Sequence, residues 1–293
     1  MKRKMKKAAW VYLALSVLLG SCNSGVDQAE KQEEKVTEKR IVSLSGSITE
    51  VIYAVGSEKE LIGVDVTSTY PAAAEKLTNL GHVRKLALES LLALKPTHVL
   101  MLEDEVSPDL KSRLKQAKIE LVAFNHPNSV AGSKKLVKEV AGWLGKESEG
   151  KELVAKIDAA IQGLSKPDKK PKVLFVYARG AGTLMVAGEN TPLEKMIVLA
   201  GGENAGKGFT DFKPLTSESV IAANPDVILM FTSGAQSLGP DGIFHVPGVS
   251  ATTAGKNKAL IQMDGQLLSG FGPRVAEALI ELNKAFKQVE LSR

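Results

Sequence analysis

The side chains that most often do chemistry are few and scattered in this 293-residue chain. It has one cysteine, Cys22, and four histidines, and no two histidines lie three or four residues apart. This excludes a disulfide framework and a zinc site with several cysteines or regularly spaced histidines. Patterns such as H-E-x-x-H, G-x-S-x-G, an EF-hand loop or a P-loop are absent from the sequence. A metal-handling enzyme would need a His/Glu pair facing a cleft, which the sequence does not assemble, so we expect a binding protein and not an enzyme.

Two glutamates stand at equivalent places in an internal repeat. Residues 86–101 (LALESLLALKPTHVLM) and 215–230 (LTSESVIAANPDVILM) align at a constant offset of 129. Each copy places a glutamate, Glu89 or Glu218, in the first turn of a short predicted helix that ends at a proline before a buried strand. The repeat predicts two lobes of the same architecture.

The net charge of +5 belongs to one end of the chain. Residues 1–21 hold five basic side chains and no acidic one, which leaves 33 of each sign in the rest. Nucleic-acid binding through a broad basic surface is therefore not predicted. The basic residues precede an apolar run of about 12 residues, Ala8–Leu19, which is typical of a secretory signal and short for a membrane span.

A cysteine follows this run directly. Leu19-Gly20-Ser21-Cys22 resembles a bacterial lipobox, in which the cysteine is lipidated and becomes the first mature residue. We expect residues 1–21 to be a lipoprotein signal peptide and Cys22 to anchor an exported protein to the membrane. The alternative is an ordinary signal with a free or buried cysteine. Residues 22–40 are polar and charged, which predicts a flexible tether or, alternatively, a short amphipathic helix.

Apolar runs alternate with amphipathic segments from Ile41 onward, which is typical of an α/β fold. We expect an N-terminal lobe over residues 41–145, a linker helix over 146–166 and a C-terminal lobe over 167–293. The linker is predicted from apolar residues at helical spacing, which are Leu153, Ile157, Ile161 and Leu164. The fold class is therefore α/β, with two doubly wound lobes joined by a single long helix and a ligand cleft between them. Within the first lobe, Ser47–Glu50 has the spacing of a capping box that opens a helix.

Together these features resemble the binding proteins of siderophore, cobalamin and haem ABC importers over residues 40–290. Shorter motifs are similar to the haem-binding branch, and they are Gly63–Pro71, Leu80–Arg84, Met185–Gly188, Phe212–Leu215 and Met263–Arg274. In this family an exposed glutamate on each lobe docks against arginines of the permease dimer. The resemblance assigns that role to Glu89 and Glu218. The alternative is that the helix dipole alone favours a glutamate at each place.

The resemblance also implies an iron ligand. In the haem-binding branch the tyrosine before the proline of the first motif binds the haem iron, and here that residue is Tyr70, followed by Pro71. A phenolate is a hard anionic oxygen donor that suits ferric iron. The alternative is a turn aromatic that packs on Pro71. We further expect Thr67 and Ser68 to bind a haem propionate or to support the residues that contact the haem, and Arg84 to be a cation beside the phenolate or a propionate.

A second axial ligand is less well defined. Some family members have a histidine in the turn after the first strand of the second lobe, where this chain has Arg179. We therefore expect five-coordinate iron on Tyr70, with Arg179 paired to a propionate or supporting the phenolate. His82 and His245 are the alternatives for a second ligand. Met185 and Phe271 are expected to form walls against the porphyrin.

The sequence thus predicts a monomeric, lipid-anchored protein, facing the periplasm or the cell exterior, that captures haem b and delivers it to an ABC permease. Other cargoes remain open. A ferric siderophore usually requires several cleft arginines, and a corrinoid requires no phenolate ligand. A third alternative is a surface lipoprotein that scavenges haem without a permease.

Overall fold

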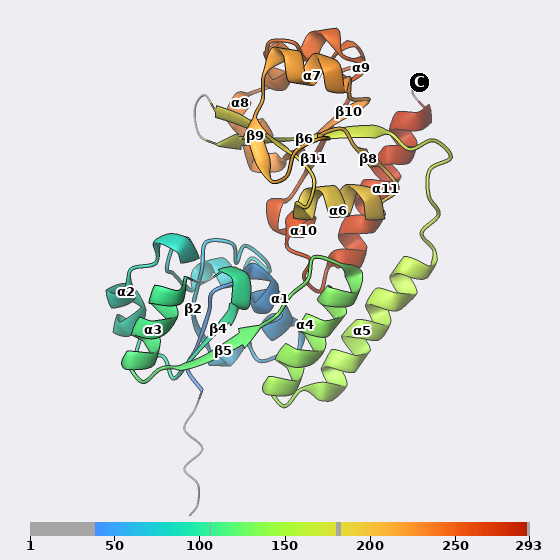
Figure 1. The fold of residues 1–293 in the computed structure, drawn as a ribbon. Coiled ribbons are helices and arrows are strands. Elements are labelled where there is room, and N and C mark those ends of the chain that lie inside the picture. Colours follow the sequence, from blue (N-terminus) through green and yellow to red (C-terminus); the bar gives the residue numbers. More distant parts are fainter. Residues whose placement is uncertain (1–38, 106, 180–182, 292–293) are drawn as a thin grey trace, which may run out of the picture. The chain divides into compact units, whose positions relative to one another are not determined.

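A computed structural model describes residues 39–105, 107–179 and 183–291 of the chain (Figure 1). The predicted signal peptide, Cys22 and most of the predicted tether lie outside the described residues. Among the described helices, none is both long and apolar enough to cross a membrane.

The first sheet has five parallel strands in the order β3-β2-β1-β4-β5. The strands are β1 (Ile41–Ser43), β2 (Leu61–Val64), β3 (Thr78–Asn79), β4 (His98–Leu102) and β5 (Glu120–Phe124). The helices between them are α1 (Gly46–Ala54), α2 (Leu88–Ala93), α3 (Pro108–Gln116) and, after β5, α4 (Val130–Trp143). The chain leaves central β1 for β2 on one side and later returns to β4 on the other. Loops at the carboxyl ends of β1, β2 and β4 therefore meet at a switch point, where doubly wound sheets bind ligands.

Alternate side chains of this sheet enter two different apolar layers. Ile41 and Leu100 pack in the cluster that contains the buried faces of α1 and α4. Their neighbours Val42 and Val99 pack in the cluster that contains buried leucines of α2 and α3. Helices thus cover both faces, as expected for a parallel sheet of nearly continuous apolar strands.

The second sheet has the order β11-β10-β6-β7-β9, and a short strand, β8, pairs with β6. The strands are β6 (Lys172–Arg179), β7 (Thr183–Ala187), β8 (Glu203–Asn204), β9 (Phe212–Pro214), β10 (Val227–Phe231) and β11 (Leu260–Met263). The helices are α6 (Pro192–Leu199), α7 (Ser217–Ala223), α8 (Thr232–Leu238), α9 (Thr253–Lys256) and α10 (Gly265–Ser269). Strands β7 and β9 are antiparallel to their neighbours, whereas β10, β11 and β8 are parallel. The second lobe is therefore a parallel sheet extended by an antiparallel pair of strands, which the sequence did not predict.

The internal repeat has the same local structure in both lobes. Helix α2 precedes β4, and α7 precedes β10, with the strands starting 129 residues apart. Lys95 and Asn224, which follow α2 and α7, are also 129 apart, and both have left-handed backbone with φ values of 50° and 37°. The predicted α/β fold with two related lobes is thereby confirmed.

One helix connects the two lobes, and side-chain packing adds to this connection. Helix α5 (Glu147–Gln162) leads from the first lobe to the second, and Gly163 stands at its carboxyl end. The C-terminal helix α11 (Val275–Leu291) packs against α5 and also contacts α4 and α6 (Figure 1). One apolar cluster includes residues from both sheets and from α4, α5 and α11. The boundary between the lobes is therefore a continuous core that includes the single connecting helix.

Candidate functional site

A buried carboxylate shapes the loop that carries Tyr70. Strand β2 ends at Val64, and the next residue, Asp65, is 2 % exposed. Its Oδ2 accepts hydrogen bonds from the backbone N and the Oγ1 of Thr67 at 3.2 and 2.7 Å, and its Oδ1 accepts one from Ser68 Oγ at 2.8 Å. Burial raises the pKa of Asp65, and these hydrogen bonds oppose the shift. The loop is thus held by short-range polar contacts that orient the residues leading to Tyr70.

Thr67 and Ser68, expected near the haem, serve first as parts of this loop. Ser68 is buried, and its hydroxyl also lies 2.8 Å from Thr49 Oγ1 on α1. Thr67 Oγ1 accepts a hydrogen bond from the backbone N of Gly46 at 2.9 Å. Gly46 fits closely, since a Cβ there would lie 2.4 Å from the Thr67 carbonyl oxygen. Both side chains are therefore occupied by internal hydrogen bonds.

Tyr70 projects from the end of the loop and is 46 % exposed. The guanidinium of Arg274, which stands just before α11 in the second lobe, covers its ring, with Cζ 3.7 Å from the ring centroid. A guanidinium over an aromatic face is an attractive cation–π arrangement. Tyr70 therefore lies at the boundary between the two lobes with a phenol that solvent can reach.

Arg274 is held in place by Glu50 of α1. Arg274 Nε and Nη2 donate hydrogen bonds to Glu50 Oε2 and Oε1 at 3.0 and 2.6 Å. Glu50 is 4 % exposed; burial raises its pKa, and the hydrogen bond and charge of Arg274 oppose that shift. A paired, bidentate geometry is what a buried carboxylate requires. This ion pair joins the lobes across 224 residues of sequence.

The expected capping box at Ser47–Glu50 is wrong, because both side chains bind the second lobe. Helix α1 begins after Ser45, which makes no side-chain capping bond. Ser47 Oγ donates a hydrogen bond to the Gly270 carbonyl at 2.6 Å and accepts one from Gln266 Nε2 at 3.2 Å. Spacing alone could not separate a local cap from contacts to residues more than 200 positions away.

The expected wall residue Phe271 is a core residue in this structure. Its side chain is fully buried within the shared apolar cluster, and its backbone φ is +46°. Its carbonyl oxygen lies 2.9 Å from His126 Nε2. Since a carbonyl only accepts, His126 donates and carries a proton on Nε2. Burial lowers the pKa of His126, so this histidine belongs to the lobe boundary as a neutral donor.

Aromatic side chains not singled out from the sequence cluster near the carboxyl ends of β6 and β10. Tyr177 packs edge-on against Phe231, with ring centroids 5.7 Å apart, and lies 6.4 Å from Phe212. Met185, the other expected wall residue, pairs with Tyr177 in the β6–β7 register and is half-buried. The signal in the sequence is that Tyr177 and Phe231 each stand at the end of an apolar run. The carboxyl ends of parallel strands form the sheet edge where ligands bind.

A small pocket of about 240 Å³ has lining residues from both lobes. The first lobe contributes Ser47, Thr67, His126 and the acidic run Glu103–Glu105, and the second contributes Pro192, Gln266, Ser269 and Gly270. Tyr70 is not among its lining residues.

The acidic end of the pocket perturbs one carboxyl strongly. Glu105 keeps part of its surface exposed, but desolvation and then the charge of Asp65 raise its pKa to about 7, while Arg84 opposes the shift. Arg84 itself lies in a short 3₁₀ turn and is exposed. The cation on the Tyr70 ring is Arg274, whereas the charge of Arg84 acts on the Glu105 carboxyl and lowers its pKa.

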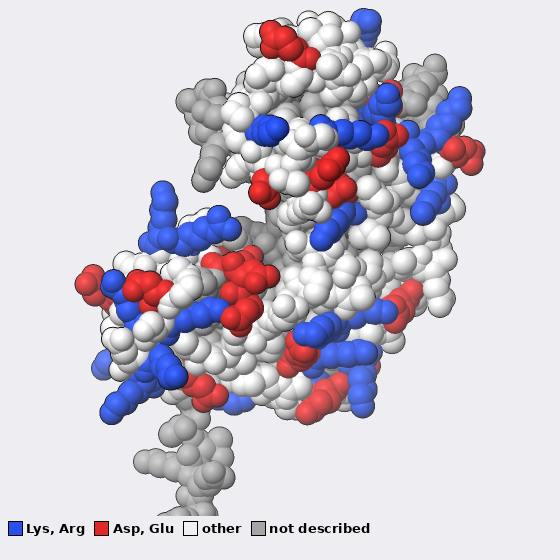
Figure 2. Space-filling model, viewed as in Figure 1, with Lys and Arg blue, Asp and Glu red and all other residues white. Residues whose placement is uncertain are grey.

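Of the remaining predicted residues, those whose side chains the structure describes are exposed. His82 and His245 are exposed, and His82 Nδ1 accepts a hydrogen bond from the Arg84 backbone N at 3.2 Å. Arg179 ends β6, and its side chain lies outside the described part of the structure. Glu89 and Glu218 are both exposed. Acidic and basic side chains are interleaved on the face drawn in Figure 2, consistent with the equal numbers of each sign after residue 21.

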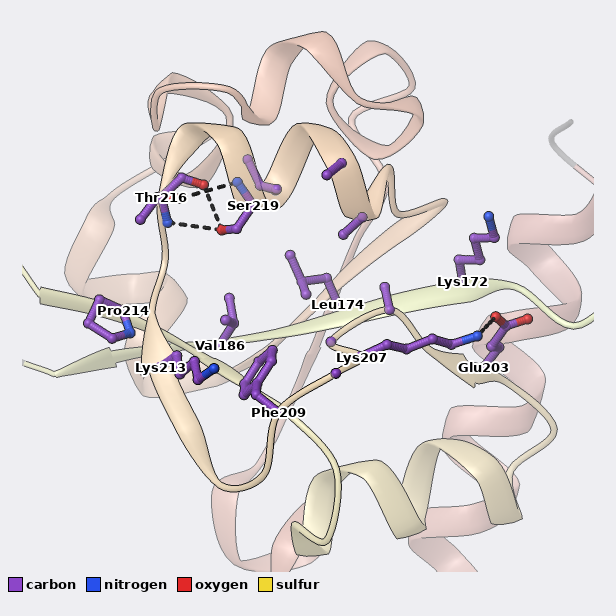
Figure 3. A pocket seen from close by; sticks show the side chains of 16 residues that line it. Lys172, Leu174, Val186, Glu203, Lys207, Phe209, Lys213, Pro214, Thr216 and Ser219 are labelled. Atoms are coloured by element: carbon purple, nitrogen blue, oxygen red, sulfur yellow. Dashed lines mark hydrogen bonds and ion pairs between the residues drawn. The ribbon is translucent and has the colours of Figure 1, made fainter.

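A larger hollow of about 650 Å³ lies within the second lobe (Figure 3). Leu174, Val186 and Phe209 form apolar parts of its lining, and Lys172, Lys207 and Lys213 supply cations. Lys213 Nζ lies 4.7 Å from the centroid of the Phe209 ring, and Lys207 is paired with Glu203. Its other lining residues come from β8 and the loop after it, from β9 and from α7 with its N-cap, and none of the lining residues belongs to the first lobe. This hollow is thus separate from the boundary at which Tyr70 lies.

Comparisons with known proteins agree with this architecture. The chain is 38 % identical to the periplasmic haem-binding protein RhuT from Roseiflexus sp. RS-1, with a TM-score of 0.82 over 86 % of this chain and 99 % of that one. It is 26 % identical to an uncharacterized ABC transporter substrate-binding lipoprotein, YvrC of Bacillus subtilis, over 95 % of this chain and 96 % of the relative. A vitamin B12-binding protein of Vibrio vulnificus is 27 % identical over 87 % of this chain and 92 % of its own length.

A family model described as periplasmic binding protein matches residues 41–267. The match covers both sheets and the Tyr70 loop, and it ends within α10. With its two related lobes and the Tyr70 site at their boundary, the chain belongs to the periplasmic binding protein family.

Proposed function

We propose that this protein is the extracytoplasmic solute-binding component of an ABC importer and that its cargo is haem, held between the lobes. The observation that carries the proposal is the exposed Tyr70 ring at the lobe boundary beneath Arg274. Resemblance to a haem-binding relative at 38 % identity supports the choice of cargo. The activity is capture and release, with no chemical conversion of the cargo.

Tyr70 is proposed to bind the ferric iron through its phenolate oxygen. A phenolate is an anionic, hard donor of the type that holds iron in some haem proteins. Arg274 supports the anion because its positive charge lies against the ring and is fixed there by Glu50. Preorganisation of this kind adds affinity because fewer side chains must be ordered on binding.

The porphyrin faces are proposed to contact Tyr177, Met185 and Phe231 of the second lobe. Two of these are aromatic, and aromatic rings bury large apolar areas and stack on flat π systems. They take the place of Phe271, which is buried in the core. Haem propionates are expected to avoid the acidic run Glu103–Glu105 and to point toward cations such as Arg84 and Arg179 at the rim.

Delivery is proposed to use one carboxylate on each lobe. Glu89 and Glu218 are exposed at equivalent places of the internal repeat, and two like charges on related lobes match a two-fold permease dimer with cationic contacts. A lipid on Cys22 would keep the protein at the membrane where the permease lies.

The test is an absorbance titration of purified residues 38–293 with ferric haem. We expect saturable binding with a high-spin, tyrosinate-type spectrum, and we expect Tyr70→Phe to lose that spectrum. Tyr53→Phe is the matched control, because Tyr53 lies on α1 in the same lobe and is half-buried. No saturable change with the unmodified protein would sink the haem proposal.

A corrinoid is the second candidate cargo, because a vitamin B12-binding relative is 27 % identical. The same titration is therefore repeated with cobalamin. Cobalamin binding that survives Tyr70→Phe, together with absent haem binding, would assign the protein to corrinoid uptake.

A further inference from the structure

Each lobe exposes one large aliphatic side chain at the same position of the internal repeat. Leu92 on α2 is 37 % exposed, and Ile221 on α7 is 49 % exposed. The two positions are 129 residues apart, the offset that relates the whole repeat. Single exposed apolar residues are common on protein surfaces and require no explanation. Here the same exposure occurs twice, at corresponding places of two lobes.

The geometry of the two helices places each aliphatic side chain next to a docking glutamate. Leu92 follows Glu89 by three residues, and Ile221 follows Glu218 by three residues. Residues three apart in a helix lie on the same face. The interior faces of these helices are filled by other side chains, since Leu91 and Val220 are 0 % and 1 % exposed. Each lobe therefore presents a carboxylate and an aliphatic side chain together on an outward face.

The duplication determines the kind of partner that fits. A partner with two identical subunits offers the same surface twice, related by a two-fold axis. Two related lobes can meet such a partner at both surfaces at once, and two linked contacts reinforce each other. The carboxylates require cations opposite them, and the aliphatic side chains require an apolar recess beside each cation.

We propose that Leu92 and Ile221 are paired apolar anchors that insert into equivalent recesses of the two permease subunits, beside the cations that bind Glu89 and Glu218. This rests on the proposed function in one respect, namely that the partner is a permease dimer. The carboxylates orient the two proteins and attract the permease at a distance. The aliphatic side chains become buried when the proteins dock and then supply most of the contact energy. The surface defined by Glu89, Leu92, Glu218 and Ile221 is called the paired docking surface below.

The experiment measures binding of the purified chain to membrane vesicles from the bacterium that naturally makes this protein. The vesicles are prepared from cells in which the gene for this protein has been deleted. Vesicles from a strain that also lacks the permease serve as the blank. We expect Leu92→Ser and Ile221→Ser each to weaken binding about tenfold, from the loss of a buried aliphatic contact. The double variant is expected to lose about a hundredfold, because the sites are on different lobes and act independently.

Two controls keep the result specific. Val198→Ser and Ile280→Ser remove equally exposed aliphatic side chains on α6 and α11, at 50 % and 44 % exposure, and should leave vesicle binding unchanged. The haem affinity and the urea midpoint of every variant should match those of the unmodified chain. This result would show that the substituted side chains contribute neither to cargo binding nor to the stability of the fold.

Several outcomes would overturn the proposal. If the Leu92→Ser/Ile221→Ser variant binds the vesicles as well as the unmodified chain, the two aliphatic side chains are not anchors. This holds even if Glu89 and Glu218 variants bind the vesicles less well. Equal loss in the Val198 and Ile280 controls, or equal binding to vesicles without permease, would show a contact of another kind. A failed haem titration with normal permease-dependent vesicle binding would overturn the cargo and leave the paired docking surface in place.

Discussion

The guanidinium carbon of Arg274 lies 3.7 Å from the centroid of the Tyr70 ring. Through this contact a residue of the second lobe touches the proposed iron ligand on the first. The guanidinium has a fixed position because Glu50, buried in α1, holds it through two hydrogen bonds. If Tyr70 binds the cargo as proposed, cargo binding and the contact between the lobes depend on the same side chain.

Replacing Arg274 should therefore affect both stability and binding. Arg274→Gln leaves Glu50 buried without its cation, and we expect a loss of about 3 kcal/mol in the free energy of unfolding. The double variant Glu50→Gln/Arg274→Gln should recover most of that loss, because no unpaired buried charge remains. Urea denaturation at pH 7 measures both effects.

The haem affinity should behave differently from the stability in these two variants. Both lack the cation over Tyr70, so both should bind ferric haem more weakly than the unmodified protein, whatever their stability. Lys134→Gln is the control, since it removes an ion pair with Asp158 on exposed helix surfaces. Normal haem affinity in both Arg274 variants would show that the cation does not support the phenolate.

The carboxyl of Glu105 should make stability depend on pH. Desolvation and the charge of Asp65 raise its folded-state pKa to about 7 from an ordinary value of 4.5. The folded protein then holds this proton more tightly than the unfolded chain, so the contribution to stability is full below about pH 4.5 and is lost as the pH rises through about 7. Glu105→Gln should remove that loss of stability. As the pH increases from 5 to 8, the urea midpoint of the variant should therefore rise relative to that of the unmodified protein. Parallel pH profiles would contradict the assignment, and Glu89→Gln, outside the pocket, is the matched control.

Asp65 should be required for the shape of the Tyr70 loop. Asp65→Ala removes the acceptor for two hydroxyls and one backbone N, and leaving such buried donors unpaired costs about 2 kcal/mol. We expect a lower urea midpoint and a weaker tyrosinate-type haem spectrum, since Tyr70 is no longer oriented. Asp168→Ala, on the exposed segment after α5, should change neither. A stable Asp65→Ala variant with a normal spectrum would show that the loop is held by other contacts.

Reversing the two docking charges should separate uptake from binding. Glu89→Arg together with Glu218→Arg places two cations where the permease is expected to have its own, and like charges repel. We expect haem-dependent growth of the producing strain to fail while the purified variant binds haem normally. Growth that survives both reversals would favour a scavenging lipoprotein that works without a permease.

Cys22 should decide where the protein is found. Cys22→Ser removes the thiol that a lipid would modify, so the variant should move from the membrane fraction to the soluble extracytoplasmic fraction. Fractionation of cells followed by immunoblotting measures the shift. A variant that stays in the membrane fraction would contradict the lipobox interpretation.

The parts of the fold that follow from local pattern could be predicted from the sequence. The repeat around Glu89 and Glu218 fixed two related lobes, because a proline-ended helix before a buried strand is a local signal. The antiparallel strands β7 and β9 were missed, since an apolar run does not reveal the direction of its partner.

The site was predictable only in part, for a related reason. Tyr70 stood out through a motif, whereas its partner Arg274 and the acceptor Glu50 lie 204 and 20 residues away in sequence. The spacing between Ser47 and Glu50 predicts a capping box, because a local pattern does not reveal a partner in the second lobe. Phe271 is apolar, as a wall residue should be, but only the packing shows that its side chain is buried in the core.

The apolar cluster that α4, α5 and α11 share with both sheets bears on how the cargo can leave. Asn283 of α11 adds two hydrogen bonds to this junction, to the carbonyls of Ser165 and Ala200. We therefore expect that a gene split near residue 165, which divides this shared cluster, yields two insoluble fragments. The intact body should instead melt as one cooperative block, with the spacing of its two docking carboxylates built into that block. Thermal fluctuation alone would then rarely separate the lobes, so release of the cargo would require the proposed permease to supply the energy that separates them.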